Sequence, residues 1–244
     1  RLAYVVRKEK SKSLVLQNVL TRKIEQRINL KDVDEPESPS FSPDGRRIVF
    51  SAMRNAVGDI FVVDLATEEV TNLTKDEFAD YGPTYAPDGA SVVYMARISG
   101  NEKLFKLDLA SGKKTQLTFG THDDAAPRFL DADTLVFPST ATDPNQAVEA
   151  EVARNGATYN LWTLNIKNGE LRQWTDTIGG TFSPAVLRDG KTTKIAFVSY
   201  YKGEYGLHLF DRKEPLMTSN TGDFGAPGPV IDFQAPLTHA FVPE

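Results

Sequence analysis

Apolar residues recur along this chain in short groups that alternate with polar residues, the two-residue period of half-buried β-strands. The groups themselves repeat as a set: Pro39, Pro83 and Pro127 lie 44 residues apart, and Pro184 follows 57 residues later. Each interval holds four such groups, separated by turns rich in Asp and Gly. A repeat of this length with four short strands is typical of a β-propeller blade. The chain is therefore predicted to be all-β, a β-propeller of four-stranded antiparallel blades.

The third strand of each copy shows how many blades are present, because it aligns without gaps five times. These strands are predicted at residues 14–19, 60–65, 104–109, 161–166 and 207–212. The first copy begins at its second strand, near Leu2, so five blades are visible and the first lacks its inner strand. We expect residues 1–216 to form the blades and residues 217–244 to form a C-terminal tail that holds a connector and a possible ring-closing strand.

Closure of the ring has two alternatives. Blades are stabilised by packing on both neighbours, so an open ring leaves two apolar faces in water. Residues 228–233, Gly-Pro-Val-Ile-Asp-Phe, can supply the missing strand and close a ring of five. Alternatively, blades upstream of Arg1 complete the ring. If the tail closes it, deletion of everything after Leu216 should destabilise the protein or drive association.

The fourth copy carries an insertion of about 14 residues between its second and third strands. Within it, Asp143 suits a helix N-cap, Pro144 suits the first helical position, and Asn-Gly at 155–156 can end the helix. The insertion predicts a short helix over residues 144–154.

Composition narrows the functional classes. The chain of 244 residues is 40% hydrophobic and 25% charged, which fits one all-β domain. Its net charge of −5 argues against a nucleic-acid partner, since phosphate-binding domains usually present a basic face. No run of about 18 apolar residues occurs, so no helical membrane span is predicted. The absence of cysteine removes disulfides and thiolate ligands.

The inner turns indicate a family. Ser-Pro-Asp-Gly at 42–45 and Ala-Pro-Asp-Gly at 86–89 reverse the chain, because proline fixes the turn entry and glycine takes the left-handed position. With Asp-Leu-Ala at 64–66 and 108–110 and Leu-Thr at 73–74 and 117–118, residues 1–215 resemble the WD-repeat-like blades of TolB-type propellers. The inner turns at 130–133 and 187–190 depart from this pattern.

The tail carries a second resemblance. Residues 230–239 resemble the connector that precedes a surface-antigen type outer-membrane barrel in large bacterial envelope proteins. The two resemblances imply a periplasmic, non-enzymatic protein-interaction platform, one segment of a larger envelope protein that continues into a barrel. Similar propellers also precede α/β-hydrolase domains in prolyl peptidases. The alternative is therefore a regulatory or substrate-gating propeller of a hydrolase whose catalytic domain is absent from this chain.

Signatures of catalysis are missing from the sequence. There is no Gly-x-Ser-x-Gly elbow and no glycine loop that could cradle a phosphate. The histidines, His122, His208 and His239, fall in a loop, a third strand and the tail, which does not predict convergent metal ligands. Although relatives among sugar-acid lyases bind a metal, we predict no catalytic residue, metal site or cofactor.

Candidate partner-binding residues lie in the loops that lead from each outer strand into the next inner strand. In a propeller these loops share one face, near the mouth of the central channel. They are rich in acidic residues here, so the face is expected to steer a basic protein partner or a cation. The candidates are Asp34, Glu35, Asp80, Tyr81, His122, Asp123 and Asp124.

Aromatic residues and a cluster of basic residues give two further predictions. Aromatic residues at matched repeat positions are predicted to form the core between blades; they are Phe41, Phe50, Phe61, Tyr85, Tyr94, Phe105, Phe129, Phe137 and Trp162. By contrast, Tyr200, Tyr201 and Tyr205 do not follow the repeat and suit a contact surface on a hairpin. The basic cluster at residues 7–12 is expected to form a solvated edge.

Overall fold

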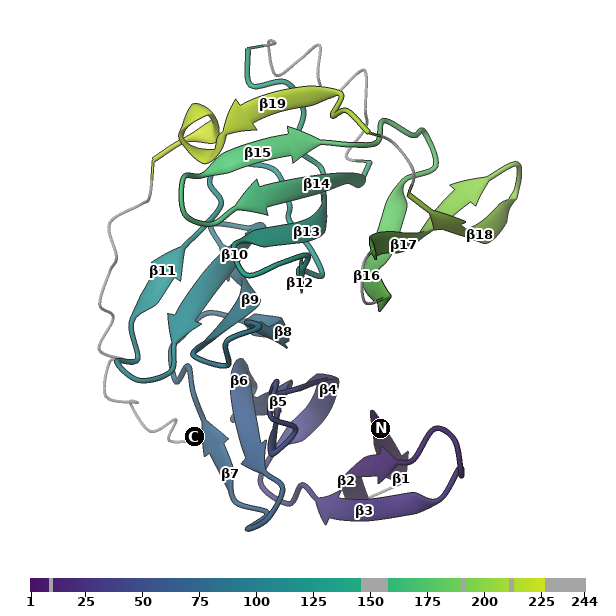
Figure 1. Cartoon of the computed structure of the whole chain (residues 1–244). Coiled ribbons are helices and arrows are strands. Elements are labelled where there is room, and N and C mark those ends of the chain that lie inside the picture. The colour runs from purple at the N-terminus through teal and green to yellow at the C-terminus, as the bar shows by residue number, and fades with distance from the viewer. Residues whose placement is uncertain (9–10, 146–157, 190–191, 211–212, 227–244) are drawn as a thin grey trace, which may run out of the picture.

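A computed structural model describes residues 1–8, 11–145, 158–189, 192–210 and 213–226. Within these residues the chain forms nineteen β-strands and one 3-10 turn. The strands form five antiparallel sheets that follow one another around an arc, from the N-terminal sheet in purple to the fifth sheet in green (Figure 1). The prediction of an all-β propeller with five visible blades is therefore confirmed.

The first three blades follow the chain in order. Blade 1 contains β1 (Leu2–Lys8), β2 (Ser11–Gln17) and β3 (Ile24–Asn29). Blade 2 contains β4 (Asp34–Phe41), β5 (Arg47–Arg54), β6 (Val57–Asp64) and β7 (Val70–Asn72). Blade 3 contains β8 (Asp80–Tyr85), β9 (Ser91–Ile98), β10 (Asn101–Asp108) and β11 (Lys114–Gln116). Blade 1 has three strands in the order β1-β2-β3, so it lacks an inner strand as predicted.

The last strand of the chain belongs to blade 4, although it follows blade 5 in the sequence. Blade 4 contains β12 (Arg128–Phe129), β13 (Thr134–Ser139), β14 (Asn160–Asn165) and β15 (Glu170–Gln173). Blade 5 contains β16 (Thr181–Asp189), β17 (Thr192–Tyr201) and β18 (Glu204–Leu209). The chain then returns to blade 4, where β19 (Met217–Asn220) pairs antiparallel with β15 as a fifth strand. The 3-10 turn η1 (Thr221–Phe224) follows β19 directly.

The inner turns have the predicted geometry. Gly45 and Gly89 adopt positive φ angles of 68° and 71°, which glycine tolerates best. In each turn the glycine N–H donates to the carbonyl three residues earlier, over 2.9 Å. These two turns reverse the inner strand into the second strand of blades 2 and 3.

Four apolar clusters hold the arc together, one at each junction between consecutive blades. Leu14 and Leu16 of blade 1 pack with Phe50 and Phe61 of blade 2, and Val136 of blade 4 packs with blade 5. Burial of one such side chain contributes about 1.5–3 kcal/mol. Of the aromatic residues predicted to form this core, Phe41 and Phe105 are partly buried and the other seven are buried.

The two ends of the arc, blade 1 and blade 5, lie on the same side of the molecule (Figure 1). The face of blade 5 that does not pack on blade 4 exposes Leu187, Leu207 and Leu209. The predicted ring-closing strand at residues 228–233 falls outside the described residues. So does nearly all of the helix predicted over residues 144–154, and closure of the ring remains a prediction.

Candidate functional site

The loops that enter the inner strands lie at the same end of the blades as the hairpins between second and third strands. In blade 5, Thr181 at the start of β16 pairs with Ser199, close to the hairpin that joins β17 to β18. In blade 3, Asp80 at the start of β8 pairs with Ala96, close to the hairpin between β9 and β10. We call this end of the blades the mouth face.

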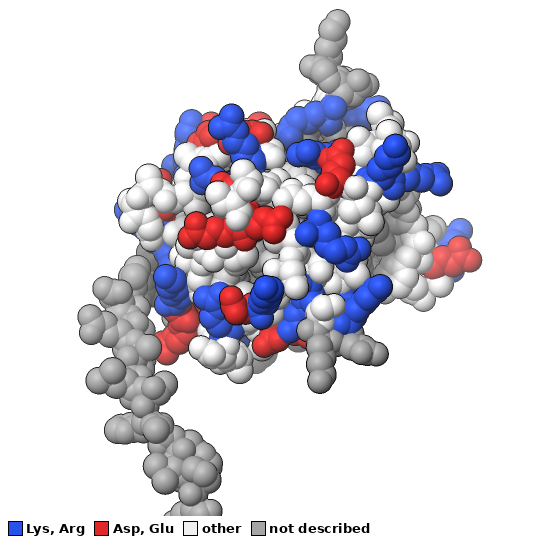
Figure 2. Space-filling view, turned by 90° about the horizontal axis from the view of Figure 1, so that it is seen from below, with Lys and Arg blue, Asp and Glu red and all other residues white. Residues whose placement is uncertain are grey.

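The first two candidate residues are paired with the basic cluster of blade 1. Asp34 forms an ion pair with Lys12, and Glu35 forms one with Arg7. Arg7 also binds Glu37 at 3.0 Å. Surface pairs of this kind contribute little to stability, but they reduce the net negative charge that the sequence predicted here. On the side of the molecule seen in Figure 2, acidic and basic side chains are interleaved.

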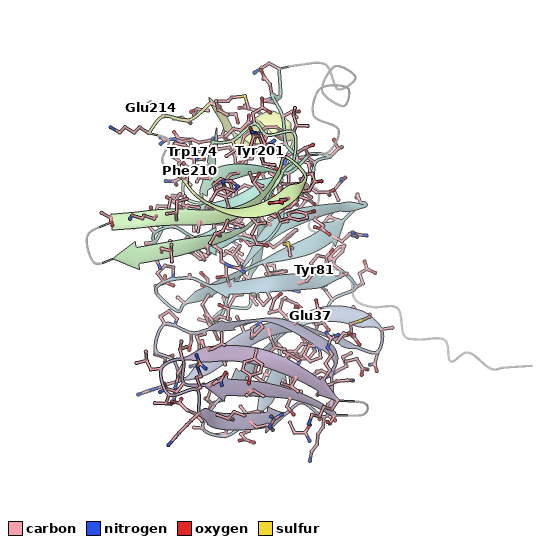
Figure 3. The ribbon with its side chains drawn as sticks, turned by 90° about the vertical axis from the view of Figure 1, so that its right-hand side faces the viewer. Glu37, Tyr81, Trp174, Tyr201, Phe210 and Glu214 are labelled. Carbon is pink, nitrogen blue, oxygen red and sulfur yellow. The ribbon has the colours of Figure 1, made fainter. Side chains whose placement is uncertain are left out.

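Tyr81 and Asp123 belong to a hydrogen-bonded group around Glu102. The Tyr81 hydroxyl donates to Glu102 Oε1 over 3.4 Å, and Arg97 lies 3.3 Å from the same oxygen. Asp123 Oδ1 accepts from the backbone N–H of Glu102 over 2.9 Å. Tyr81 lies on β8, which contacts β4 of the preceding blade, the strand that carries Glu37; both side chains are labelled in Figure 3. Tyr81 is half-buried, so part of its ring stays accessible at the mouth face.

Asp124 and His122 lie deeper, in a buried ion-pair cluster between blades 3 and 4. Lys103 Nζ lies 3.1 Å from Asp124 Oδ2, and His122 Nε2 lies 3.4 Å from the same oxygen. Burial opposes ionisation of Asp124, but the charges of His122 and Lys103 outweigh it and hold the pKa of Asp124 well below its ordinary value. The cluster is internal, so Asp124 does not present a carboxylate to solvent.

Asp80 is also buried, at the junction of blades 2 and 3. Burial, with Asp76 and Asp59 nearby, raises the pKa of Asp80 to about 8. Asp59 is a residue that the sequence analysis missed. Comparison of the repeats could have found it, because position 59 of one copy corresponds to Lys103 of the next, 44 residues later.

The tyrosines outside the repeat lie on the mouth face of blade 5. Tyr200 and Tyr201 end β17 and are 43% and 66% exposed. Ile178, in the loop that leads to β16, is fully exposed. The loop touches the hairpin, since a Cβ on Gly179 would meet the Tyr200 carbonyl oxygen. We call Ile178, Tyr200 and Tyr201 the hairpin surface.

Among the described residues, no helix is long and apolar enough to cross a membrane. The same residues hold one group of three or more acidic or histidine side chains close enough to share a metal ion, namely Asp59, Asp76 and Asp80.

Comparisons with known structures agree with the fold. TolB from Acinetobacter baumannii is 23% identical, with a TM-score of 0.59, over 86% of this chain and 51% of that chain. A putative TolB from Agrobacterium tumefaciens is 18% identical, with a TM-score of 0.65, over 89% of this chain and 77% of that one. A puromycin-hydrolyzing peptidase from Mycobacterium tuberculosis is 13% identical, with a TM-score of 0.56, over 86% of this chain and 37% of that one.

The chain thus spans about half the length of the first of these structures. No curated protein matches the sequence. The sequence model described as TolB beta propeller domain matches residues 1–159, well over half of the chain. Together with the five-bladed arc, this match shows that the chain belongs to the family of the TolB beta propeller domain.

Proposed function

We propose that this chain is a non-enzymatic protein-interaction platform of the bacterial envelope and a segment of a larger protein. The observation that carries the proposal is the hairpin surface, where Ile178, Tyr200 and Tyr201 are each exposed at the same end of blade 5. Tyrosine is enriched where binding energy concentrates in protein interfaces, because it buries a large, stiff and amphipathic side chain.

Charge around the hairpin surface is mixed, with acidic residues in excess: Lys202 Nζ lies 5.2 Å from the centre of the Tyr201 ring, and two carboxylates lie nearby. Glu204 faces Tyr201 across the hairpin, and Asp176 precedes Ile178 in the neighbouring loop; both are exposed. Negative charge at the rim of an apolar contact speeds the encounter with a positively charged protein more than it tightens the complex. The net charge of −5 on the whole chain also attracts a positively charged protein.

The arrangement of the polar clusters supports a binding role in preference to catalysis. His122 and Asp124 form the pair that most resembles part of a catalytic site, but the Asp124 carboxylate is fully buried and also bound by Lys103. A substrate would have to meet this pair through His122, whose side chain is 11% exposed, directs Nε2 at Asp124 and packs edge to face on Phe224. No cofactor is part of the proposal.

The periplasmic setting and the continuation into an outer-membrane barrel rest on the sequence of the tail, which resembles a connector ahead of such a barrel. The alternative, a gating propeller of a hydrolase, has a structural parallel in the mycobacterial peptidase, of which this chain covers 37%. That likeness concerns the fold alone.

The parent reading frame distinguishes the two. Alternating, turn-separated strands of about ten residues downstream of Glu244 would support the envelope platform. A downstream domain with a Gly-x-Ser-x-Gly elbow after a strand would instead make the propeller the gate of a peptidase.

A further inference from the structure

Three carboxylates from two blades converge at the junction of blades 2 and 3. Asp59 lies on β6, Asp76 follows β7, and Asp80 begins β8. One oxygen from each lies within 4.8 Å of the others. Oxygens bound to one Ca²⁺ at 2.3–2.6 Å are at most about 5 Å apart, so all three fit a single coordination shell.

Asp80 is the member of this group that needs a ligand. It is 1% exposed, and neither of its carboxylate oxygens has a hydrogen-bond partner, because the nearby Thr74 hydroxyl donates to Asp59. Asp59 differs, since its oxygens accept from Asn72 over 2.7 Å and from Thr74 over 3.1 Å. A buried carboxylate without any donor is costly, and native structures rarely leave one unexplained.

The junction of blades 3 and 4 shows what accompanies the buried aspartate in the next copy of the repeat. The repeat places Lys103 and Asp124 where Asp59 and Asp80 stand, each 44 residues later. The surroundings also correspond: Thr74 Oγ1 accepts from Ile60 N, and Thr118 Oγ1 accepts from Leu104 N, both over 3.0 Å. At that junction the Lys103 ammonium neutralises the buried aspartate. At this one the equivalent position holds a second aspartate, Asp59, and not a lysine.

Charge balance sets the kind of ligand. Asp76 pairs with Lys114, whose ammonium also donates to the Thr74 carbonyl oxygen over 2.6 Å. Three carboxylates and one ammonium leave a formal charge of −2. Oxygen donors select hard cations, and Ca²⁺ tolerates irregular geometry better than Mg²⁺ does.

We propose that Asp59, Asp76 and Asp80 bind one hard divalent cation of the Ca²⁺ class, which joins blade 2 to blade 3 as the Lys103 ammonium joins blade 3 to blade 4. The site lies inside the junction and is separate from the hairpin surface, so its test is independent of the proposed function.

The test is Ca²⁺ titration of chelator-treated protein by calorimetry, together with thermal unfolding. We expect one Ca²⁺ per chain and a rise in Tm of about 5 °C or more at a hundredfold excess over the dissociation constant. Asp80→Asn should abolish both effects. Asp88→Asn, which alters an exposed turn aspartate of the same blade, should keep them.

A double variant that copies the junction of blades 3 and 4 provides a second test. Asp59→Lys combined with Asn72→Gln copies two side chains of the next junction, where Lys103 and Gln116 occupy these positions. It should unfold at or above the Tm of the Ca²⁺-bound native protein and should not respond to Ca²⁺. If a variant at Asp80 or Asp59 fails to fold, Asp76→Asn, in a partly exposed loop, replaces it.

Two results would overturn the proposal. One is the absence of Ca²⁺ binding by the native protein, which would mean that Asp80 is kept neutral by a proton. The other is binding and stabilisation of Asp80→Asn equal to those of the native protein, which would place the ion elsewhere.

Discussion

Lys103 and Asp124 form an ion pair of 3.1 Å in which neither side chain is more than 2% exposed. The two residues belong to different blades, since Lys103 lies on β10 and Asp124 lies in the loop that leads to blade 4. Loss of Lys103 would leave Asp124 buried with His122 as its remaining charged neighbour, and loss of Asp124 would leave the Lys103 ammonium buried without its carboxylate. The pair therefore couples the stability of the two blades.

Lys103→Met should destabilise the protein by about 3–5 kcal/mol, because it leaves Asp124 buried without its ammonium partner. Urea unfolding measures the change. Lys167→Met is the matched control, since Lys167 pairs with Asp133 at 2.7 Å but is mostly exposed. An equal, small effect of the two substitutions would show that the buried pair does not couple the blades.

Asp124 also predicts a pH dependence. Its pKa is lowered in the folded protein, so below about pH 4 the unfolded chain binds more protons than the folded one. The stability that Asp124 contributes is present above that pH and is lost as the pH falls through the ordinary pKa towards the lowered folded value. When the pH is lowered from 6 to 3, the urea midpoint of unfolding should therefore decrease less steeply for Asp124→Asn than for the native protein. Parallel curves for the two proteins would refute this assignment.

Truncations separate the roles of the tail. Removal of everything after Leu216 deletes β19 and Phe224, which meets Trp162 edge to face at 6.2 Å. This loss exposes the edge of β15 and part of the blade 4 core, so we expect a lower Tm or association.

Removal of everything after Ala226 keeps β19 and η1 but deletes the predicted ring-closing strand. If residues 228–233 close the ring, this shorter truncation should lower the Tm as well. An unchanged Tm and a monomeric product, measured by thermal unfolding and light scattering, would contradict closure by the tail.

The repeat explains how much of the fold could be predicted from the sequence. Strand positions, inner turns and the aromatic core follow a period of 44 residues, because each blade faces the same packing problem on both sides. The pairing of β19 could not be predicted, since Met-Thr-Ser-Asn carries little apolar pattern and its partner strand lies more than 40 residues earlier. At the junction of blades 4 and 5, Trp174 packs against Phe210 at 5.3 Å (Figure 3). The equivalent positions at the two preceding junctions hold leucines, Leu73 with Leu107 and Leu117 with Leu164.

The candidate site was harder to predict because burial depends on the neighbouring blade. Asp80 and Asp124 stand in loops that look exposed in the sequence, yet the start of the inner strand lies beneath the preceding blade. Asp34 and Glu35 stay at the surface, but the basic residues that pair with them come from a hairpin more than 20 residues away. Exposure of Tyr200 and Tyr201 agrees with their departure from the repeat.

The most direct test of the interaction role is site-specific photocrosslinking in the full-length protein within its host. A photoreactive residue at Tyr201 should yield a discrete protein adduct, and Ile178→Ser should weaken it. The photoreactive residue placed instead at Ser111 should give no adduct. Ser111 lies in an exposed turn between β10 and β11, at the end of blade 3 opposite the mouth face. Absence of an adduct at Tyr201, or the same adducts at both positions, would contradict the account of the hairpin surface as the binding site of a protein partner.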